Sequence, residues 1–100
     1  MNLQDLSPEQ MENILSNRVP FLLLSLSANF EALFPNPLHR SFARSMAVEV
    51  DAENALPLLS ERKTPLYQAI VIAGSEKEQR RELAKRLESA GYTNVFVYMH

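Results

Sequence analysis

The most constraining feature of this sequence is residues 69–79, which have the pattern of a buried strand, a tight turn and the start of a helix. The apolar run over 69–73 is typical of a strand covered on both faces in a parallel sheet. Gly74 predicts a turn, and Ser75 with Glu78 has the spacing of a capping box at a helix N-terminus. A strand that leads directly into a helix indicates an α/β fold.

The rest of the chain alternates between apolar runs and helical patterns in the same way. Ser7, Pro8 and Gln10 predict a capped helix start, and Gly91 predicts the left-handed residue that ends a helix. The further predicted elements are a strand over 19–26, a short helix over 28–34, an irregular segment over 36–45, a strand over 46–50, a late or bent helix after Asp51, a polar loop over 60–65, a helix from Ser75 with the buried stripe Leu83, Ala84, Leu87 and Ala90, and a strand over 95–99. This order predicts a single α/β domain over residues 1–100, with a mostly parallel sheet of four or five strands and helices on both faces.

The composition argues against several classes of function. The chain has 100 residues, a formal net charge of −2 and no cysteine. Nucleic-acid binding needs a basic face, a membrane span needs a run of about 18 apolar residues, and a disulfide framework needs cysteines, so we expect none of them. We expect a cytoplasmic protein without a secretory signal. The two histidines, His39 and His100, are far apart in the sequence, so we predict no metal site, and no dinucleotide or phosphate-loop motif predicts a cofactor.

Four segments resemble a rhodanese-like domain. Residues 6–11 resemble the opening strand-to-helix signature of that family, residues 21–27 its second strand, and residues 30–32 the short helix that follows. Residues 84–95 resemble its last core helix, the glycine that ends this helix, and the next strand. The family order of elements extends over residues 3–98, and the resemblance implies a rhodanese-like form of the α/β fold.

The active-site residue of the family is missing from this chain. In rhodanese-like enzymes the corresponding turn carries a cysteine that becomes a persulfide, and this chemistry needs a thiolate. Gly74 falls at that position, and neither Ala73 nor Ser75 is a thiol. Ser25 and Ser27 stand where the family usually has an aspartate and an arginine. The resemblance therefore implies the fold and argues against sulfur transfer, and we predict no catalytic residue.

The turn after the buried strand is the candidate ligand site, because ligands of parallel sheets bind at the carboxyl ends of strands. The amides of a helix N-terminus favour an anion there. The candidate residues are Gly74, Ser75, Glu76, Lys77, Glu78 and Gln79 of the turn, with Arg40 and Arg44 from the irregular segment. The alternative is a purely structural turn, in which Ser75 caps the helix and Glu76 and Glu78 satisfy its first turn.

The sequence leaves three hypotheses for the function. The first is a catalytically inactive rhodanese-like domain that acts as a binding or regulatory module for another protein. The second is a small-anion sensor, or an enzyme without a thiol, that uses residues 74–79 with Arg40 or Arg44. The third is self-association through residues 95–99, if that strand lies at an edge of the sheet. On the predicted helix from Ser75, four basic residues alternate with glutamates and predict a solvent-exposed helix face: Arg80, Arg81, Lys85 and Arg86.

Overall fold

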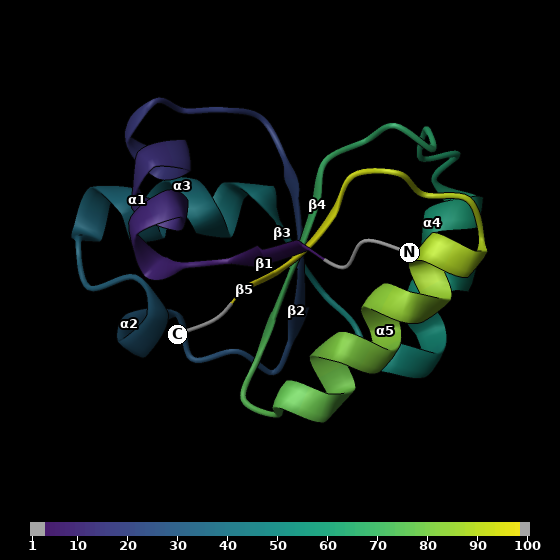
Figure 1. Cartoon of the computed structure of the whole chain (residues 1–100). Helices are drawn as coiled ribbons and strands as arrows, with labels where there is room; N and C mark the ends of the chain where they lie inside the picture. Colours follow the sequence, from purple (N-terminus) through teal and green to yellow (C-terminus); the bar gives the residue numbers. More distant parts are fainter. Residues whose placement is uncertain (1–3, 99–100) are drawn as a thin grey trace.

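The computed structural model describes residues 4–98, which contain one five-stranded sheet (Figure 1). The strands are β1 (Gln4–Leu6), β2 (Leu22–Leu26), β3 (Ala47–Glu49), β4 (Ile70–Gly74) and β5 (Val95–Tyr98). Their order across the sheet is β1-β5-β4-β2-β3, and every neighbouring pair is parallel. The predicted α/β fold with a mostly parallel sheet is confirmed, and the observed sheet is wholly parallel.

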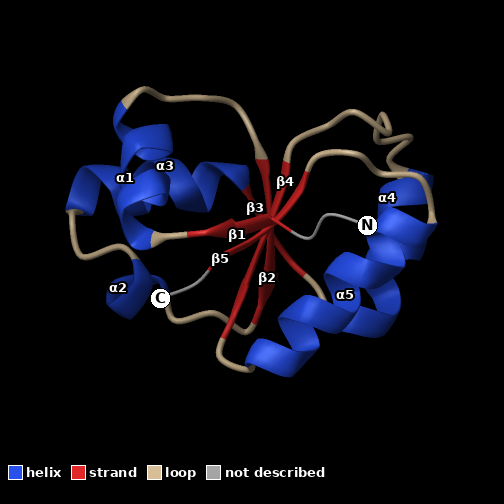
Figure 2. Ribbon diagram, in the orientation of Figure 1, coloured by secondary structure: helices blue, strands red, loops and turns tan. Residues whose placement is uncertain are grey.

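Helices cover both faces of this sheet, as Figure 2 shows with the sheet seen edge-on, so that its strands cross in the view. The helices are α1 (Pro8–Ser16), α2 (Phe30–Leu33), α3 (Pro37–Met46), α4 (Ala55–Glu61) and α5 (Lys77–Ser89), with a 3₁₀ helix, η1 (Ala52–Asn54), before α4. α1, α2 and α3 lie over one face, and α4 and α5 lie over the other. Because successive side chains of a strand point to opposite faces, Val71 packs in the first core and Ile72 in the second.

β5 lies inside the sheet, between β1 and β4. This position excludes the hypothesis that β5 forms an exposed edge at which two copies pair. Met99, the last residue of the predicted strand, lies outside the described residues. The edge strand on that side is β1, in which Gln4 and Asp5 are exposed. β1 has too little apolar sequence to predict a strand alone, and its pairing with β5 defines it.

Helix α3 occupies the segment predicted to be irregular, so that prediction is wrong. Pro37 is the first residue of the helix, where the missing N–H of proline would have no helical partner in any case. The side-chain oxygen of Asn36 accepts hydrogen bonds from the backbone amides of Leu38 (2.9 Å) and His39 (3.4 Å) and caps the helix. The helix also includes the first residue of the predicted strand over 46–50, which leaves β3 shorter than predicted.

The two predicted capping boxes have different outcomes. The box at the start of α1 is confirmed, because the Ser7 hydroxyl accepts from the Gln10 amide (3.2 Å) and the Gln10 side chain accepts from the Ser7 amide (2.9 Å). The box at the start of α5 is absent. α5 begins at Lys77, its N-cap residue is Glu76, and no side chain caps it. The helix starts one residue later than the predicted box requires, which leaves Ser75 in the turn.

The remaining helix predictions hold in most of their details. α4 begins late, after η1, with Pro57 as its third residue, and Asp51 makes no side-chain capping bond. α4 extends to Glu61, into the segment predicted to be a polar loop. α5 buries Leu83, Ala84 and Leu87 but leaves Ala90 exposed at its C-cap. Gly91 has a φ of +105°, as the left-handed end of a helix requires.

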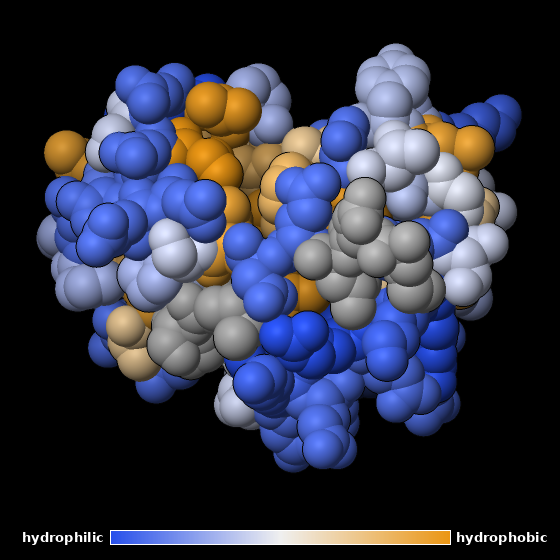
Figure 3. All heavy atoms as spheres, in the orientation of Figure 1, coloured by the Kyte–Doolittle hydropathy of each residue, from blue (hydrophilic) through white to orange (hydrophobic). Residues whose placement is uncertain are grey.

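The molecular surface in Figure 3 is mostly hydrophilic. Apolar side chains gather on this face in the hollow beside the helices at the left of the view. Among residues 4–98, no helix is both long enough and apolar enough to cross a membrane.

Candidate functional site

Gly74 is the last residue of β4 and lies directly beside Leu26 of β2. A Cβ atom at Gly74 would lie 2.9 Å from the Cβ atom of Leu26 and 3.0 Å from its carbonyl oxygen. Real Cβ contacts are essentially never shorter than 3.0 Å, so any side chain at this position requires the strand pair to shift. The closeness of the two strands accounts for the glycine, and a cysteine side chain at this position has no room unless the strands shift.

Arg80, the fourth residue of α5, is a buried cation beneath this turn. It is 5% exposed, and its guanidinium donates a hydrogen bond to the carbonyl oxygen of Gly74. The Nε atom of Arg80 is also buried and has no hydrogen-bond partner among the described residues. Burial, followed by the charge of Arg81, lowers the pKa of the Arg80 guanidinium. The prediction that Arg80 belongs to a solvent-exposed helix face is therefore wrong.

A cavity of about 420 Å³ opens beside the Gly74 turn. It lies where the chain leaves β2, β3 and β4, at the carboxyl end of the sheet, as the rule for parallel sheets predicts. Its lining residues are Leu26, Ser27, Val50, Asp51, Ala52, Glu53, Ser75, Glu76 and Gln79.

The cavity has an acidic lining. Asp51, Glu53 and Glu76 contribute carboxylates, and no arginine, lysine or histidine is among the lining residues. A fourth acid lies close by, because the Glu49 carboxylate accepts a hydrogen bond from the backbone amide of Ser27 (3.0 Å). Carboxylates favour a cation and disfavour an anion at short range. The electrostatics of this cavity therefore differ from those of a site that holds thiosulfate or sulfate.

The structure places three of the predicted turn residues, Ser75, Glu76 and Gln79, in the wall of this cavity. Lys77 and Glu78 are exposed on the first turn of α5 and do not line it. Ser75 lies on the turn with no histidine among its cavity neighbours. Since a serine nucleophile needs an adjacent base, this arrangement gives Ser75 no catalytic partner.

Arg40 and Arg44 lie on α3, over the other face of the sheet, and have partners of their own. Arg40 donates from Nε to the Phe34 carbonyl (3.1 Å) and from Nη2 to the Pro35 carbonyl (3.2 Å). The Arg44 guanidinium lies 4.8 Å from the centre of the Phe30 ring, a cation–π distance. Neither arginine lines the cavity at the Gly74 turn, so the structure does not bring the two predicted halves of an anion site together there.

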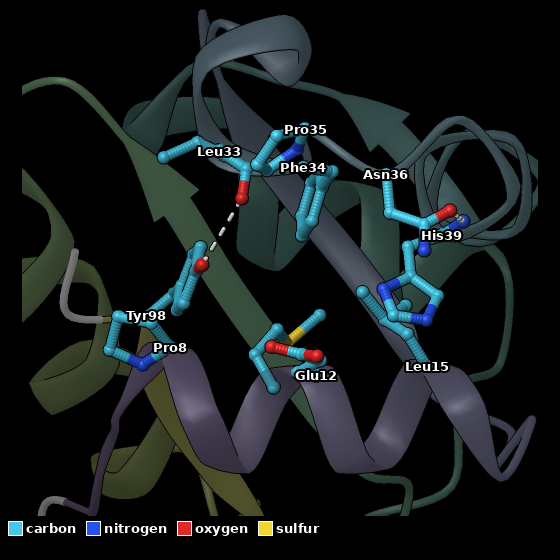
Figure 4. Close-up of a pocket in the computed structure, with 10 residues that line it drawn as sticks. Pro8, Glu12, Leu15, Leu33, Phe34, Pro35, Asn36, His39 and Tyr98 are labelled. Carbon is cyan, nitrogen blue, oxygen red and sulfur yellow. Dashed lines mark hydrogen bonds between the residues drawn. The ribbon is translucent and has the colours of Figure 1, made fainter.

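A second cavity, of about 280 Å³, lies between α1, the end of α2, the start of α3 and the end of β5 (Figure 4). Its lining residues are Pro8, Met11, Glu12, Leu15, Leu33, Phe34, Pro35, Asn36, His39 and Tyr98. The rings of Phe34 and Tyr98 are parallel, with centroids 5.8 Å apart. The sequence does not predict this site, because its residues lie far apart along the chain and no motif links them.

Tyr98 is the buried polar residue of this second cavity. It is 3% exposed, and its hydroxyl donates a hydrogen bond to the carbonyl oxygen of Leu33 (3.3 Å). Burial, followed by the negative charge of Glu12, raises the pKa of the Tyr98 phenol. A buried tyrosine with a nearby carboxylate at a concave apolar surface is a common feature of binding sites.

Two of the other polar side chains of this cavity, His39 and Asn36, have hydrogen-bond partners within the protein, and Glu12 has none among the described residues. His39 Nε2 lies 3.0 Å from the hydroxyl of Ser16, and the side-chain oxygen of Asn36 caps α3. No hydrogen bond or ion pair engages the Glu12 carboxylate among the described residues. Figure 4 shows Glu12 on α1 between Tyr98 and His39. Across residues 4–98 the structure contains no group of three or more potential ligands that could hold a metal ion.

Comparison with known proteins identifies the fold. No family model and no curated protein matches the sequence, but solved structures do. The solution structure of the rhodanese-like domain of the Alr3790 protein from Anabaena sp. matches with a TM-score of 0.67 and 19% identity, over 96% of this chain and 67% of that chain. The chain has the rhodanese-like fold. A crystal structure of the Alr3790 protein also matches this chain, with a TM-score of 0.66 and 15% identity, over 92% of this chain and 66% of that chain.

The likeness to these structures extends to the fold alone. A further crystal structure, of the Rhodanese_3 like domain of Alr3790, has a TM-score of 0.53 and 20% identity, over 77% of this chain and 79% of that chain. The rhodanese-like fold is present here without the cysteine of the family, because the sequence contains no cysteine. The resemblance stated from the sequence is confirmed for the fold.

Proposed function

We propose that this rhodanese-like domain is a catalytically inactive binding or regulatory module, and that the cavity beside the Gly74 turn receives a basic segment of a protein partner. The observation that carries the proposal is the absence of cysteine from the chain, together with a glycine at the turn after β4 where a side chain has no room. Persulfide chemistry needs a thiolate, and the chain has none.

The charge of the cavity supports a basic partner. Asp51, Glu53 and Glu76 line a concave surface without a lining cation. Complementary charge steers association and selects among partners, and its effect is largest in concave regions. A lysine or arginine side chain has both the charge and the reach to enter such a cavity. The cytoplasmic location expected from the sequence is part of the same proposal.

One observation favours the second candidate function, a small-anion sensor or an enzyme without a thiol. The N-terminus of α5 has no side-chain cap, and uncapped amides at a helix N-terminus attract anions. The predicted ligand residues of that alternative remain Gly74, Ser75, Glu76, Lys77, Glu78 and Gln79, with Arg40 and Arg44. The acidic lining and the separate partners of both arginines make this alternative the weaker one.

An amide NMR titration tests the two functions against each other. The probes are a lysine-rich decapeptide, its glutamate-rich counterpart, thiosulfate and sulfate, all at constant ionic strength because exposed charge pairs are screened by salt. The proposal expects saturable shifts over residues 49–53 and 74–79 with the lysine-rich peptide alone. Saturable shifts with thiosulfate or sulfate, and none with the basic peptide, would replace the proposed function by anion binding.

A pair of double variants separates the cavity from general electrostatics. Asp51→Asn with Glu53→Gln removes two lining acids, and we expect about tenfold weaker peptide binding, from up to about 1 kcal/mol for each exposed charge pair. Glu9→Gln with Glu61→Gln is the matched control, since both acids are exposed, neither lines the cavity, and the net charge changes equally. Equal weakening in both double variants would refute a local binding site.

A further inference from the structure

We propose that the second cavity, between α1, α2, α3 and β5, is a binding site for a small organic ammonium ion carried on an apolar or aromatic body. This site is separate from the acidic cavity at the Gly74 turn. None of the residues that line one cavity lines the other, and the two proposals stand or fall independently.

The walls of the cavity match an apolar body. Met11 and Leu15 come from α1, Leu33 and Phe34 come from the end of α2, and all four are among the buried core residues. Tyr98 completes this apolar lining, and Figure 4 shows it with Leu15, Leu33 and Phe34. Ligand sites are concave and mostly apolar, with few polar groups. At about 280 Å³ the cavity lies just below the volume range of drug-sized sites, which indicates a ligand of fragment size.

The polar groups of the cavity select a cation. The Glu12 carboxylate lies at the cavity and has no hydrogen bond or ion pair among the described residues. The Tyr98 hydroxyl donates its proton to the Leu33 carbonyl, so it has no second proton to donate to an anionic ligand. The rings of Phe34 and Tyr98 both line the cavity, and aromatic rings also attract cations.

Among the residues that line this cavity, His39 is the one that could carry a positive charge for an anionic ligand, and its Nε2 already lies 3.0 Å from the Ser16 hydroxyl. The first turn of α1 borders the cavity, but the capping box of Ser7 and Gln10 already occupies amides of that helix end. The nearby guanidinium of Arg40 is engaged by the Phe34 and Pro35 carbonyls and does not line the cavity. A carboxylate or phosphate entering the cavity would meet the negative charge of Glu12.

Binding of 2-phenylethylammonium, followed by NMR shifts of the Met11, Leu15 and Leu33 methyl groups, tests the proposal. We expect saturable shifts with this amine and no saturation with the anion 3-phenylpropionate or the neutral 2-phenylethanol at the same concentrations. Glu12→Gln should weaken amine binding roughly three- to tenfold. Glu9→Gln, an exposed acid on the same helix that does not line the cavity, should leave it unchanged.

Three results would overturn the inference. Equal binding of the three aryl probes, or no binding of any, would show that Glu12 does not make a cation site. Tighter binding of Nα-acetyl-lysine amide than of 2-phenylethylammonium would assign the cavity to a lysine of a protein and not to a small molecule. Glu12 is exposed, so the Glu12→Gln variant is expected to fold, and its chemical-shift spectrum checks this directly.

Discussion

Arg80 on α5 donates a hydrogen bond from its guanidinium to the backbone carbonyl of Gly74, the residue that ends β4. The arginine is the one charged residue that the structure buries within residues 4–98. This contact ties the start of α5 to the turn that follows β4. In this chain the turn is held by a buried cation below it and carries no nucleophile.

The first prediction concerns the stability that Arg80 provides. Arg80→Ala removes a charged hydrogen bond and the packing of a long side chain, and we expect it to lower the free energy of unfolding by about 2–3 kcal/mol. Arg80→Met keeps most of the packing and removes a buried charge, so its cost should stay below about 1.5 kcal/mol. Urea unfolding measures both values.

Arg81→Ala is the matched control for Arg80. Arg81 is partly exposed and pairs with Asp5 at 3.1 Å. An exposed ion pair contributes about 0–1 kcal/mol, so this variant should lose much less stability than Arg80→Ala. If the two alanine variants lost equal stability, the buried hydrogen bond to Gly74 would contribute no more to the free energy of unfolding than the exposed ion pair.

The second prediction concerns restoring a thiol to the turn. Gly74→Cys places a Cβ against Leu26, where a contact of 2.9 Å forces a shift, and overpacking of this kind costs about 1–3 kcal/mol. Ser75→Cys changes an exposed side chain, so the free energy of unfolding should change by less than about 0.5 kcal/mol. Unfolding by urea under reducing conditions compares the two. Equal stability of both variants would mean that β2 and β4 can move apart at Gly74 with little cost in free energy.

Much of the fold is predictable because its signals are local. The apolar runs of β2 and β4, the capping box at Ser7 and the glycine after α5 each depend on a few neighbouring residues. β1 is different, because Gln4 and Asp5 carry no strand signal and the partner strand β5 supplies the pairing. The sequence predicts β5 as a strand but not which strands lie beside it. Whether β5 is an exposed edge therefore depends on the order of the strands, which only the folded sheet shows.

The candidate site is less predictable, for two physical reasons. Arg80 sits in a pattern of alternating charges that normally indicates exposure, and its burial follows from the way α5 packs over the turn. The second cavity combines side chains that extend from Pro8 to Tyr98 along the chain, and only the assembled layer of α1, α2 and α3 brings them together. The acidic lining of the cavity beside the Gly74 turn likewise combines residues from separate parts of the chain, because Asp51 and Glu53 follow β3 and Glu76 follows β4.

The third prediction compares two polar residues that precede helices. Asn36 caps α3 through its side chain, so Asn36→Ala should cost about 1 kcal/mol. Ser75 has the better sequence signal for a cap but makes none, so Ser75→Ala should change the free energy of unfolding by less than about 0.5 kcal/mol. A larger loss for Ser75→Ala than for Asn36→Ala would show that α5 begins at the predicted capping box after all.

The fourth prediction concerns the alkaline limit of stability. The pKa of the Tyr98 phenol lies above its ordinary value of 10.0, first because of burial and then because of Glu12. The folded protein therefore keeps this proton at pH values at which the unfolded chain releases it. The contribution of Tyr98 to the free energy of unfolding is fully present below the ordinary pKa of the phenol. It declines as the pH rises from that value toward the higher pKa of the folded state.

Tyr98→Phe isolates this contribution. At neutral pH the variant should lose about 1 kcal/mol, because the Leu33 carbonyl loses its hydrogen bond. Above pH of about 9 the wild-type protein should lose stability more steeply than Tyr98→Phe, so the two stability curves converge. Tyr67→Phe is the control, because Tyr67 is 74% exposed, and its curve should follow that of the wild type.

Urea unfolding between pH of about 8 and 11 measures all three stability curves. A constant difference between the wild type and Tyr98→Phe over this range would mean that Tyr98 ionises equally in the folded and unfolded states.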